Sequence, residues 1–380
     1  MSAYKPLGSR IVTPPFIALG VIAAIGFFFL AMRFIYGMGS VTNLNGAHAW
    51  GIWVVYDVVV GTAFACGGYA LAITVYVLNK GKYHPLIRPA LLASLLGYAL
   101  GGLGAFFDMG RWWQFYNILL PWNWNFNSVM LEVGLCVLTY ILVLVIEFSP
   151  AVLEHFGAKK LLAVLNKMLF FFIAIGVLLP TMHQSSLGSL LIAMGYKVNP
   201  LWQTWQLQPL LALLTALCMG FSIVVFEGSF ATAGLRRPSE TPLLKGLGMA
   251  IVGLLGAFLA VRFITLLVQG KLGLLFAFDF ASFMFLVETV LFVVPLVILL
   301  SPKRRENGGQ LLIAAVSMLL GGALYRFDAF LITFAPGVGY SYFPSVPEIM
   351  VTVGLIAFEI MAYLVLVKLF PVMHDAGHEA

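Results

Sequence analysis

The chain has 380 residues, of which 62% are hydrophobic and only 9% are charged, whereas a soluble domain carries about 25% charged residues. This composition excludes a soluble enzyme and predicts an all-α integral membrane protein built mostly from spanning helices. The net charge of +6 lies mainly in short loops, where it sets membrane orientation, and it gives no support for binding to nucleic acid.

The first apolar run extends from about Pro15 to Tyr36, behind Lys5 and Arg10. It is longer than the roughly 7–15 residues of a signal-peptide core, and no small-residue cleavage site follows it, so we expect an uncleaved helix. Roughly 20 apolar residues cross a bilayer. By that measure ten spans are predicted in chain order: 15–37, 50–78, 87–113, 127–149, 165–191, 207–234, 245–269, 275–301, 309–332 and 347–371.

Basic residues are concentrated in alternate loops, which predicts that both termini lie in the cytoplasm. The basic loops contain "NKGKYHPLIRP" and "SPKRRENGG", and the pairs Lys159–Lys160 and Arg236–Arg237. The opposite loops carry only Lys197 and Lys271 and are rich in aromatic residues, as in "RWWQFYNILLPWNWNFN". Such aromatics mark a membrane interface, and an uncharged aromatic surface of this size is also suited to docking another protein.

A weak internal repeat recurs at an offset of 152 residues. "LGAFFDMGR" resembles "LGAFLAVRF", Ser149-Pro150 matches Ser301-Pro302, and "CGG" at 66–68 matches "CMG" at 218–220. The offset relates four spans to the next four, which is a parallel repeat. We therefore expect one membrane domain over 1–380, with a first four-helix bundle at 50–191, a second at 207–332, and the flanking helices 15–37 and 347–371.

Ionisable groups inside spans are costly and usually face the protein interior or a wet cavity. Most of them here fall in the non-cytoplasmic half of their helices: Arg33, Asp57, Asp108, Arg111, Glu132, His183, Arg262, Asp279, Arg326 and Asp328. Four further acids, Glu147, Glu227, Glu288 and Glu359, lie nearer the middle of the membrane or its cytoplasmic side.

Each of these groups has a structural and a functional interpretation. Asp108 and Arg111 are three residues apart, so on a helix they would share a face, either as an ion pair or as the wall of a ligand cavity. Glu132 is interpreted either as the partner of Arg111 or Arg262, or as a carboxyl in a partly dry site that passes protons. His183 follows Pro180 within a polar stretch, which suits a helix contact or a polar head group.

The sequence offers few metal ligands. A b-type haem normally takes histidines from facing helices, and only His183 lies well inside a span, so no haem is expected. The cysteines Cys66, Cys136 and Cys218 include no C-x-x-C pair, so the chain is expected to hold neither its own iron–sulfur cluster nor a zinc site. Three functions remain open: a secondary transporter, a quinone-reactive electron-transfer subunit and a passive anchor.

Several stretches strongly resemble one family. They are "GSVTNLNGAHAWGIWVVYDVVVGTAFACGGYAL", "NKGKYHPLIRPALLASLLGYALGG", "DMGRWW", "LLPTMHQSSLGSL" and "GYSYFPSVPE". They are similar to the membrane subunit of periplasmic NiFe hydrogenases (the so-called cytochrome b subunit), which resembles the polysulfide reductase membrane-subunit (NrfD-like) family. The resemblance covers nearly the whole chain, and the 24-residue second stretch, residues 79–102, is its most specific part.

The resemblance implies a multi-pass protein of the bacterial inner membrane that binds menaquinone or ubiquinone and carries no redox centre itself. Its implied partners are a periplasmic ferredoxin-like iron–sulfur subunit, the large and small hydrogenase subunits, quinone and membrane lipid. Such a subunit is not catalytic alone towards hydrogen but reacts with quinone within a hydrogen:quinone oxidoreductase. The alternatives are a quinone-reactive anchor of another periplasmic reductase, or an ion or solute transporter.

Specific roles follow as hypotheses. Glu132 is predicted to transfer protons to the quinone. Its head group is predicted to contact Asp108, Arg111 and His183, with Asp57, Tyr56 and Trp53 as secondary candidates. The steps of a proton route across the membrane are predicted to be Glu147, Glu227, Glu288 and Glu359.

Overall fold

The structure, a computed structural model, describes residues 4–234 and 240–374. Within these ranges ten helices are long and apolar enough to cross a membrane, which confirms the predicted all-α membrane fold. Arg236 and Arg237, two of the basic loop residues used to predict the membrane orientation, lie outside the described residues. The spans are Pro14–Tyr36, Val54–Val77, Gly81–Asp108, Val129–His155, Lys159–Lys197, Trp205–Thr232, Thr241–Val268, Phe280–Leu299, Gly308–Ile332 and Val346–Leu369.

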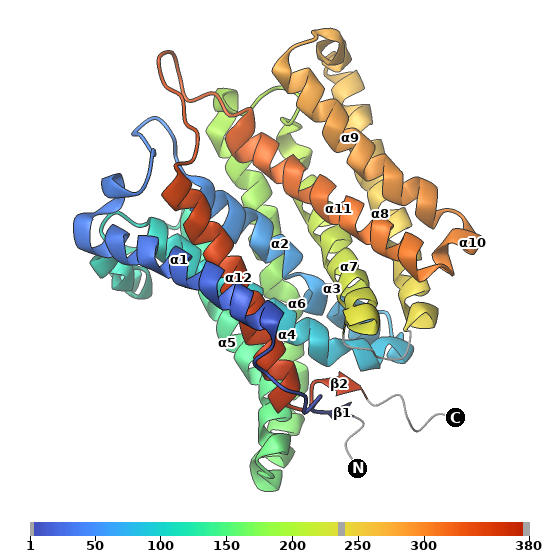
Figure 1. The fold of residues 1–380 in the computed structure, drawn as a ribbon. Helices are drawn as coiled ribbons and strands as arrows, with labels where there is room; N and C mark the ends of the chain where they lie inside the picture. The colour runs from blue at the N-terminus through green and yellow to red at the C-terminus, as the bar shows by residue number, and fades with distance from the viewer. Residues whose placement is uncertain (1–3, 235–239, 375–380) are drawn as a thin grey trace. The chain divides into compact units, whose positions relative to one another are not determined.

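The helices and strands are shown in Figure 1. The long helices are α1 (Pro14–Tyr36), α4 (Ile87–Asp108), α5 (Val129–His155), α6 (Lys159–Met194), α7 (Gln208–Gly234), α8 (Thr241–Val268), α9 (Phe280–Leu299), α11 (Gly308–Phe327) and α12 (Val346–Leu369). The short elements are α2 (Thr62–Phe64), α3 (Gly67–Ala72), α10 (Pro302–Arg305) and the strands β1 (Tyr4–Lys5) and β2 (Met373–His374).

Three stretches wind more loosely, as π-helix. They are Val54–Gly61 and Ile73–Val77 in the second span and Asp328–Ile332 at the end of the ninth. Two of the three contain a buried aspartate, Asp57 or Asp328. Because π-helix is rare and occurs frequently at functional sites, these two aspartates are candidate functional residues.

The chain forms two compact units. The first comprises Met1–Thr62, Pro85–Leu179 and Pro336–Ala380, and the second comprises Ala63–His84 and Pro180–Ala335. The second span therefore passes from one unit to the other beside Thr62, and α6 does so beside Pro180. The proposed repeat of two four-helix bundles at 50–191 and 207–332 stays a prediction.

In the first unit α1 lies along α12, and α4 packs against α5, α12 and the π-helical stretch of the second span. A close approach between glycines brings α1 and α12 together. A Cβ added at Gly26 would lie 2.8 Å from the Cα of Gly354 and 2.9 Å from the carbonyl oxygen of Met350. Small residues at such crossings are what allow helices to associate in lipid, where dispersion contacts replace the hydrophobic effect.

The two ends of the described chain are joined within the first unit. Strands β1 and β2 pair antiparallel, with Tyr4 opposite His374. The Arg88 guanidinium lies 4.1 Å from the centre of the Tyr4 ring, forms two 2.7 Å hydrogen bonds to Glu154, and donates to the carbonyl of Pro371. One arginine thus connects α4, α5 and both terminal segments.

We expect Arg88→Met to loosen this junction by about 1–2 kcal/mol, the combined scale of a partly exposed ion pair and a cation–π contact. Limited proteolysis of the purified protein should then cut the amino-terminal segment faster. Arg88→Lys keeps the charge but loses the planar two-pronged donor. Its cleavage rate should therefore lie between those of the unchanged protein and Arg88→Met. Equal cleavage rates in all three proteins would show that the terminal segments are held by other contacts.

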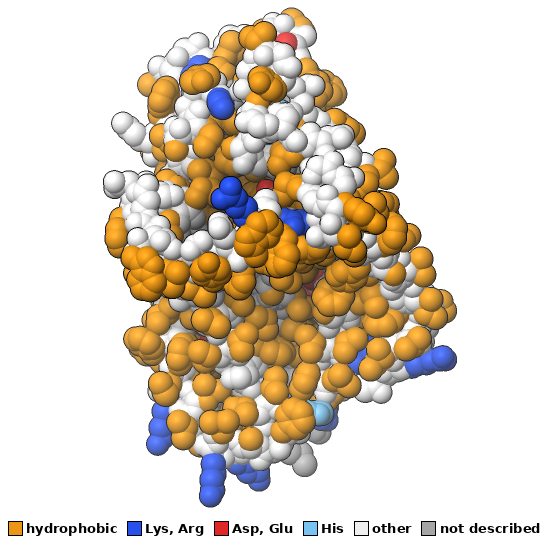
Figure 2. Space-filling model, turned by 90° about the vertical axis from the view of Figure 1, so that its left-hand side faces the viewer, with side chains coloured by type: hydrophobic (Ala, Val, Ile, Leu, Met, Phe, Trp, Pro, Cys, Tyr) orange, Lys and Arg blue, Asp and Glu red, His pale blue; other side chains and the backbone are white. Residues whose placement is uncertain are grey.

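The second unit is built around α7, which packs against α8, α11 and α3, while α11 packs against α9. Here too a glycine allows close approach, since a Cβ at Gly220 would meet the backbone of Cys66. Figure 2 shows that hydrophobic side chains make up much of one face, with scattered Lys and Arg side chains among them. Phe28, Phe170 and Phe283 are each more than 60% exposed, as expected for side chains that contact lipid.

Candidate functional site

The structure divides the predicted site residues between the two units. The first unit holds Trp53, Tyr56, Asp57, Asp108, Arg111, Glu132, Glu147 and Glu359, and the second holds His183, Glu227 and Glu288. Two buried polar clusters result, one in each unit. We call them the Asp57 cluster (Arg33, Trp53, Tyr56, Asp57, Asp108 and Glu348) and the Arg262 cluster (Trp202, Arg262, Glu288, Tyr325 and Arg326).

Asp57 lies in the π-helical stretch Val54–Gly61 and is 4% exposed. It fits against α4 only because position 104 is glycine, where an added Cβ would lie 2.5 Å from the Asp57 Oδ2 atom. This oxygen has no hydrogen-bond partner among the described residues. Asp108 and Glu359 are near enough to act on it electrostatically. A buried carboxyl oxygen left open in this way can bind a proton, a water molecule or a ligand donor.

Trp53 is fixed by a residue that sequence reasoning missed. Its Nε1–H donates to the backbone carbonyl of Glu348 at 3.0 Å. The Glu348 carboxylate accepts from the Tyr342 hydroxyl at 2.6 Å and from the backbone N–H groups of Asn43 and Ser345. Burial, and then this hydrogen bond to Glu348, raise the pKa of Tyr342. The Ser-x-x-Glu capping pattern at 345–348 was the available signal in the sequence, and it explains how the start of α12 is held.

The prediction that Asp108 and Arg111 share one helix face is wrong. Helix α4 ends at Asp108, Met109 is extended, and Arg111 is exposed in the loop that follows. The helix ends there because Arg33 of α1 donates to the backbone carbonyls of Phe107 (2.8 Å) and Met109. Arg33 is 1% exposed and also acts electrostatically on Asp108. The cation beside Asp108 therefore comes from a different helix.

Glu132 is exposed in the first turn of α5, behind the N-cap Ser128, whose side chain accepts from the backbone N–H of Leu131. A carboxylate at this position is stabilised by the positive end of the helix dipole. The partly dry surroundings that the sequence suggested are not found in the part of the chain that the structure describes. Its alternative role as partner of Arg262 is also excluded, because Arg262 pairs with Glu288.

The acids proposed for the proton route have different surroundings. Glu147 of α5 is buried against Gly176 of α6, and its Oε1 atom has no hydrogen-bond partner among the described residues. Glu227 and Glu359 are half-buried on α7 and α12. Glu288 is fully buried and held in an ion pair. The structure thus brings these acids to no single site.

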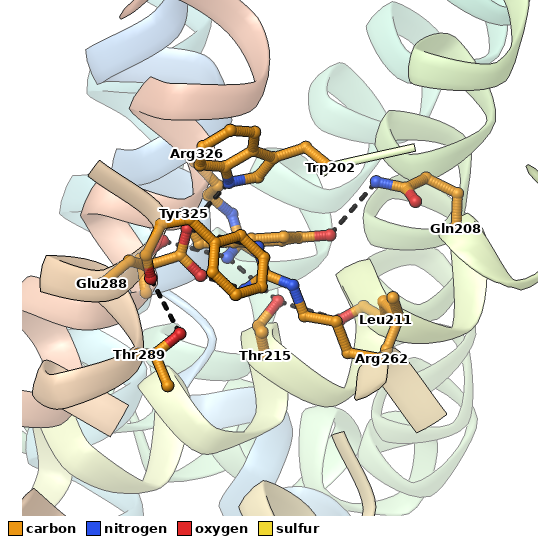
Figure 3. Close-up of polar contacts among 11 residues, drawn as sticks. Trp202, Gln208, Leu211, Thr215, Arg262, Glu288, Thr289, Tyr325 and Arg326 are labelled. Atoms are coloured by element: carbon orange, nitrogen blue, oxygen red, sulfur yellow. Dashed lines mark hydrogen bonds and ion pairs between the residues drawn. The ribbon is translucent and has the colours of Figure 1, made fainter. Parts of the chain in front are cut away.

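The Arg262 cluster occupies the interior of the second unit, as Figure 3 shows. Arg262 of α8 forms an ion pair with Glu288 of α9, and the Trp202 Nε1–H donates to the same carboxylate at 2.7 Å. The guanidinium also lies 4.2 Å from the centre of the Phe285 ring and 5.1 Å from that of Tyr325. Both ions are at most 1% exposed, so the aromatic rings and Trp202 replace the water that they lose.

A second buried arginine lies on α11. Arg326 donates to the Thr215 hydroxyl (3.0 Å), the carbonyl of Ala212 (3.2 Å) and the Gln184 side chain (3.3 Å). His183 is 1% exposed and near enough to act electrostatically with Arg326. The polar stretch after Pro180 therefore forms contacts inside the second unit, whereas Asp57 and Asp108 belong to the first unit.

Comparison with known proteins gives a consistent family. The family model described as "Polysulphide reductase, NrfD" matches residues 40–333. The "Probable Ni/Fe-hydrogenase 2 b-type cytochrome subunit" of Escherichia coli K12 is 48% identical over 97% of this chain and 95% of its own. The "Menaquinone reductase, integral membrane subunit" of Nitratidesulfovibrio vulgaris is 32% identical over 40% of this chain and 37% of its own. A selenate reductase subunit of Mesobacillus selenatarsenatis is 23% identical over 94% of each chain.

The name of the Escherichia coli relative raises the question of a haem. A b-type haem between helices takes two axial histidines. His48 belongs to the first unit and His183 to the second. The Nδ1 atom of His48 lies 3.1 Å from the Asn45 side chain, and no group of three or more metal-ligating side chains occurs among the described residues. His48 and His183 therefore do not lie in one unit, and the expectation that the chain holds no haem stays a prediction.

Proposed function

This chain belongs to the polysulphide reductase NrfD family of integral membrane proteins, and we propose on that premise that it is the quinone-reactive membrane subunit of a hydrogenase complex. It would accept electrons from a periplasmic iron–sulfur subunit and deliver them to menaquinone or ubiquinone. The names of relatives support both halves of the proposal, one naming a hydrogenase and another a menaquinone reductase.

The observation that carries the proposal is the open carboxyl oxygen of Asp57. Tyr56 lies in the same π-helical stretch and Trp53 is the residue just before it, while Asp108 is near enough to act on Asp57 electrostatically. A quinone head group needs flat apolar contacts and a few polar groups that bind its carbonyl oxygens. The Asp57 cluster supplies both kinds of group within one unit. The predicted contacts of Arg111 and His183 with the head group stay predictions.

Reducing a quinone to a quinol consumes two electrons and two protons. The electrons would come from the partner's clusters. The protons must come through side chains that can bind and release them near the head group. We propose that Asp57 holds such a proton beside the quinone and that the exposed Glu132 takes protons up from water. The predicted steps of a proton route across the membrane stay Glu147, Glu227, Glu288 and Glu359.

The proposed partner surface is the aromatic loop between α4 and α5. Trp113, Phe115, Tyr116, Trp122 and Phe126 are each at least 49% exposed, and the loop is held by short 3₁₀ turns rather than by a spanning helix. Exposed tryptophan and tyrosine are typical of interface hot spots. The iron–sulfur subunit would dock here, with the large and small hydrogenase subunits beyond it and both termini of this chain in the cytoplasm of a bacterial cell.

A second candidate is the same quinone role in another periplasmic reductase, because one relative is named as a selenate reductase subunit. An ion or solute transporter is the remaining alternative. It would move its substrate without redox partners, so co-purification with hydrogenase subunits separates the candidates.

The test is quinone reduction by hydrogen in the purified complex carrying Asp57→Asn or Glu132→Gln, with hydrogen oxidation by a soluble dye measured in parallel. We expect Asp57→Asn to lower the quinone rate by about a hundredfold, the usual scale for loss of an acid–base group, and to leave the dye rate unchanged. Glu132→Gln should lower the quinone rate less, because an exposed carboxylate can be bypassed by water.

Glu306→Gln is the matched control, since Glu306 is an exposed carboxylate that pairs with Lys245. Unchanged quinone rates in both test variants would contradict the proposed site. Equal loss of dye and quinone activity would instead indicate damage to assembly of the complex.

A further inference from the structure

Asp328 is a buried acid to which none of the roles above has been given. It begins the π-helical stretch that follows α11 and is 0% exposed. Its backbone carbonyl accepts from the Thr333 N–H (3.1 Å) and hydroxyl (2.8 Å), but neither carboxyl oxygen has a hydrogen-bond partner among the described residues. A buried polar group without a hydrogen-bond partner destabilises the fold, so a residue with only a structural role at this position would not be expected to be an acid.

The charged groups around Asp328 come from three helices. Arg262 of α8 lies beside the turn that leads into Asp328, with its guanidinium 5.1 Å from the centre of the Tyr325 ring, three residues earlier in the chain. Arg262 and Glu288 of α9 both act electrostatically on the Asp328 carboxyl. Tyr325 and Arg326 precede it on α11, and the hydroxyl of Tyr325 accepts from Gln208 at 3.1 Å. Arg326 is engaged by Thr215, Ala212 and Gln184. Arg262 is therefore the cation that Asp328 and Glu288 have in common.

The surroundings of Arg262 allow it to change partner. Besides its ion pair with Glu288, its guanidinium is flanked by the rings of Phe285, Tyr325, Phe258 and Trp202, with centres 4.2 to 5.9 Å away. Aromatic faces attract a cation without fixing the direction of its N–H groups. The two hydrogen bonds to Glu288 determine where the guanidinium points within this cage.

We propose that Asp328 is a proton-binding site that shares Arg262 with Glu288. In one state Asp328 carries the proton, and Arg262 forms the ion pair with Glu288 that is found in the structure. In the other state the proton has moved from the Asp328 carboxyl to the Glu288 carboxylate, and Arg262 pairs with Asp328. Each state contains one ion pair and one neutral carboxyl, so the exchange leaves no uncompensated charge in the membrane interior.

The inference rests on the proposed function in one respect, because Glu288 is one of the acids of the proposed proton route. It adds that Glu288 would receive its proton from Asp328. It also gives a reason for the ion pair between Glu288 and Arg262. It does not require quinone to be the substrate. Its test is therefore a measurement on the resting complex, and it succeeds or fails independently of quinone turnover.

The first measurement is infrared spectroscopy of the purified complex in H₂O and D₂O, comparing the unchanged protein with Asp328→Asn. We expect the variant to lose one deuterium-sensitive C=O band of a protonated carboxyl. Asp279→Asn is the control, because Asp279 is an exposed N-cap whose hydrogen bonds with Ser282 lower its pKa, and that variant should keep the band. If Asp328→Asn leaves the protonated-carboxyl region unchanged, Asp328 is ionised and the proposal fails.

The second measurement tests the exchange itself with Glu288→Gln. Without its partner, Arg262 should pair with Asp328, so the Asp328 band should disappear although Asp328 is intact. Persistence of that band in Glu288→Gln would overturn the exchange and leave Asp328 as a permanently neutral residue.

Thermal unfolding of the same variants gives an answer that does not depend on band assignment. Glu288→Gln should shift the unfolding midpoint only modestly, because Asp328 replaces the lost partner. The double variant Asp328→Asn/Glu288→Gln should lose more than the sum of the two single shifts, because Arg262 then has neither carboxylate. Additive shifts, or failure of Glu288→Gln to accumulate while Asp328→Asn does, would contradict the sharing of Arg262.

Discussion

Replacing Arg262 by methionine is expected to destabilise the purified protein by about 3–5 kcal/mol, the usual cost of removing one partner from a buried ion pair. Glu288 would keep its hydrogen bond from Trp202 but lose the ion pair that it forms in the described part of the chain. The aromatic cage would also lose its cation. Thermal unfolding in detergent, followed by the intrinsic fluorescence of tryptophan, measures the change.

The matched control is Lys245→Met, which removes the cation from the exposed pair Lys245–Glu306, where the side chains are 45% and 64% exposed. Exposed pairs contribute about 0–1 kcal/mol, so this midpoint should hardly move. If Arg262→Met proved as mild as Lys245→Met, the ion pair would be balanced by its own desolvation cost, and the Arg262 cluster would be unimportant for stability.

Gly26→Ala is expected to destabilise the first unit by about 1–3 kcal/mol, the cost of overpacking a well-packed contact. The added methyl would meet the Gly354 Cα and the Met350 carbonyl, and backbone atoms cannot turn aside as a flexible side chain can. Helices α1 and α12 would have to separate. The measurement is the unfolding midpoint, together with the amount of complex recovered from membranes.

Gly20→Ala is the control in the same helix. Its added methyl would lie 3.6 Å from the end of the Met361 side chain, which is ordinary van der Waals contact. Alanine is a better helix former than glycine by about 1 kcal/mol, so this variant should be neutral or slightly more stable. A loss of stability in Gly20→Ala equal to that in Gly26→Ala would mean that glycine is required along α1 for reasons other than this crossing.

The Asp57 cluster shows what could be read from the sequence and what could not. Asp57 and Asp108 were predicted as site residues because ionisable groups inside apolar spans are costly and usually serve a function or a partner, and Trp53 was predicted beside them as an aromatic contact. The structure places all three in one unit. Glu348 and Arg33, which hold this cluster together, were not predicted as part of the site. Glu348 stands in a Ser-x-x-Glu pattern, which is a signal for a helix start and not for a site. Arg33 is 74 residues from the carbonyl of Phe107 to which it donates.

The sequence by itself determined the class of the protein and its ten spans, because hydropathy and the roughly 20-residue length of a span are local properties. Local spacing failed where a partner came from another helix. Asp108 and Arg111 were expected to share one helix face, but α4 ends at Asp108, where Arg33 of α1 donates to the carbonyls of Phe107 and Met109. Arg262 was one of two arginines considered as a partner for Glu132, but it pairs with Glu288.

Only the tertiary structure decided which buried ions are paired and which carboxyl oxygens are left open. In a membrane interior these contacts are fixed by how helices distant in sequence cross one another. That in turn depends on a few glycines, such as Gly26 and Gly104, which allow close approach. Hydropathy identifies a helix as a span, but it does not say which other helices that span will cross.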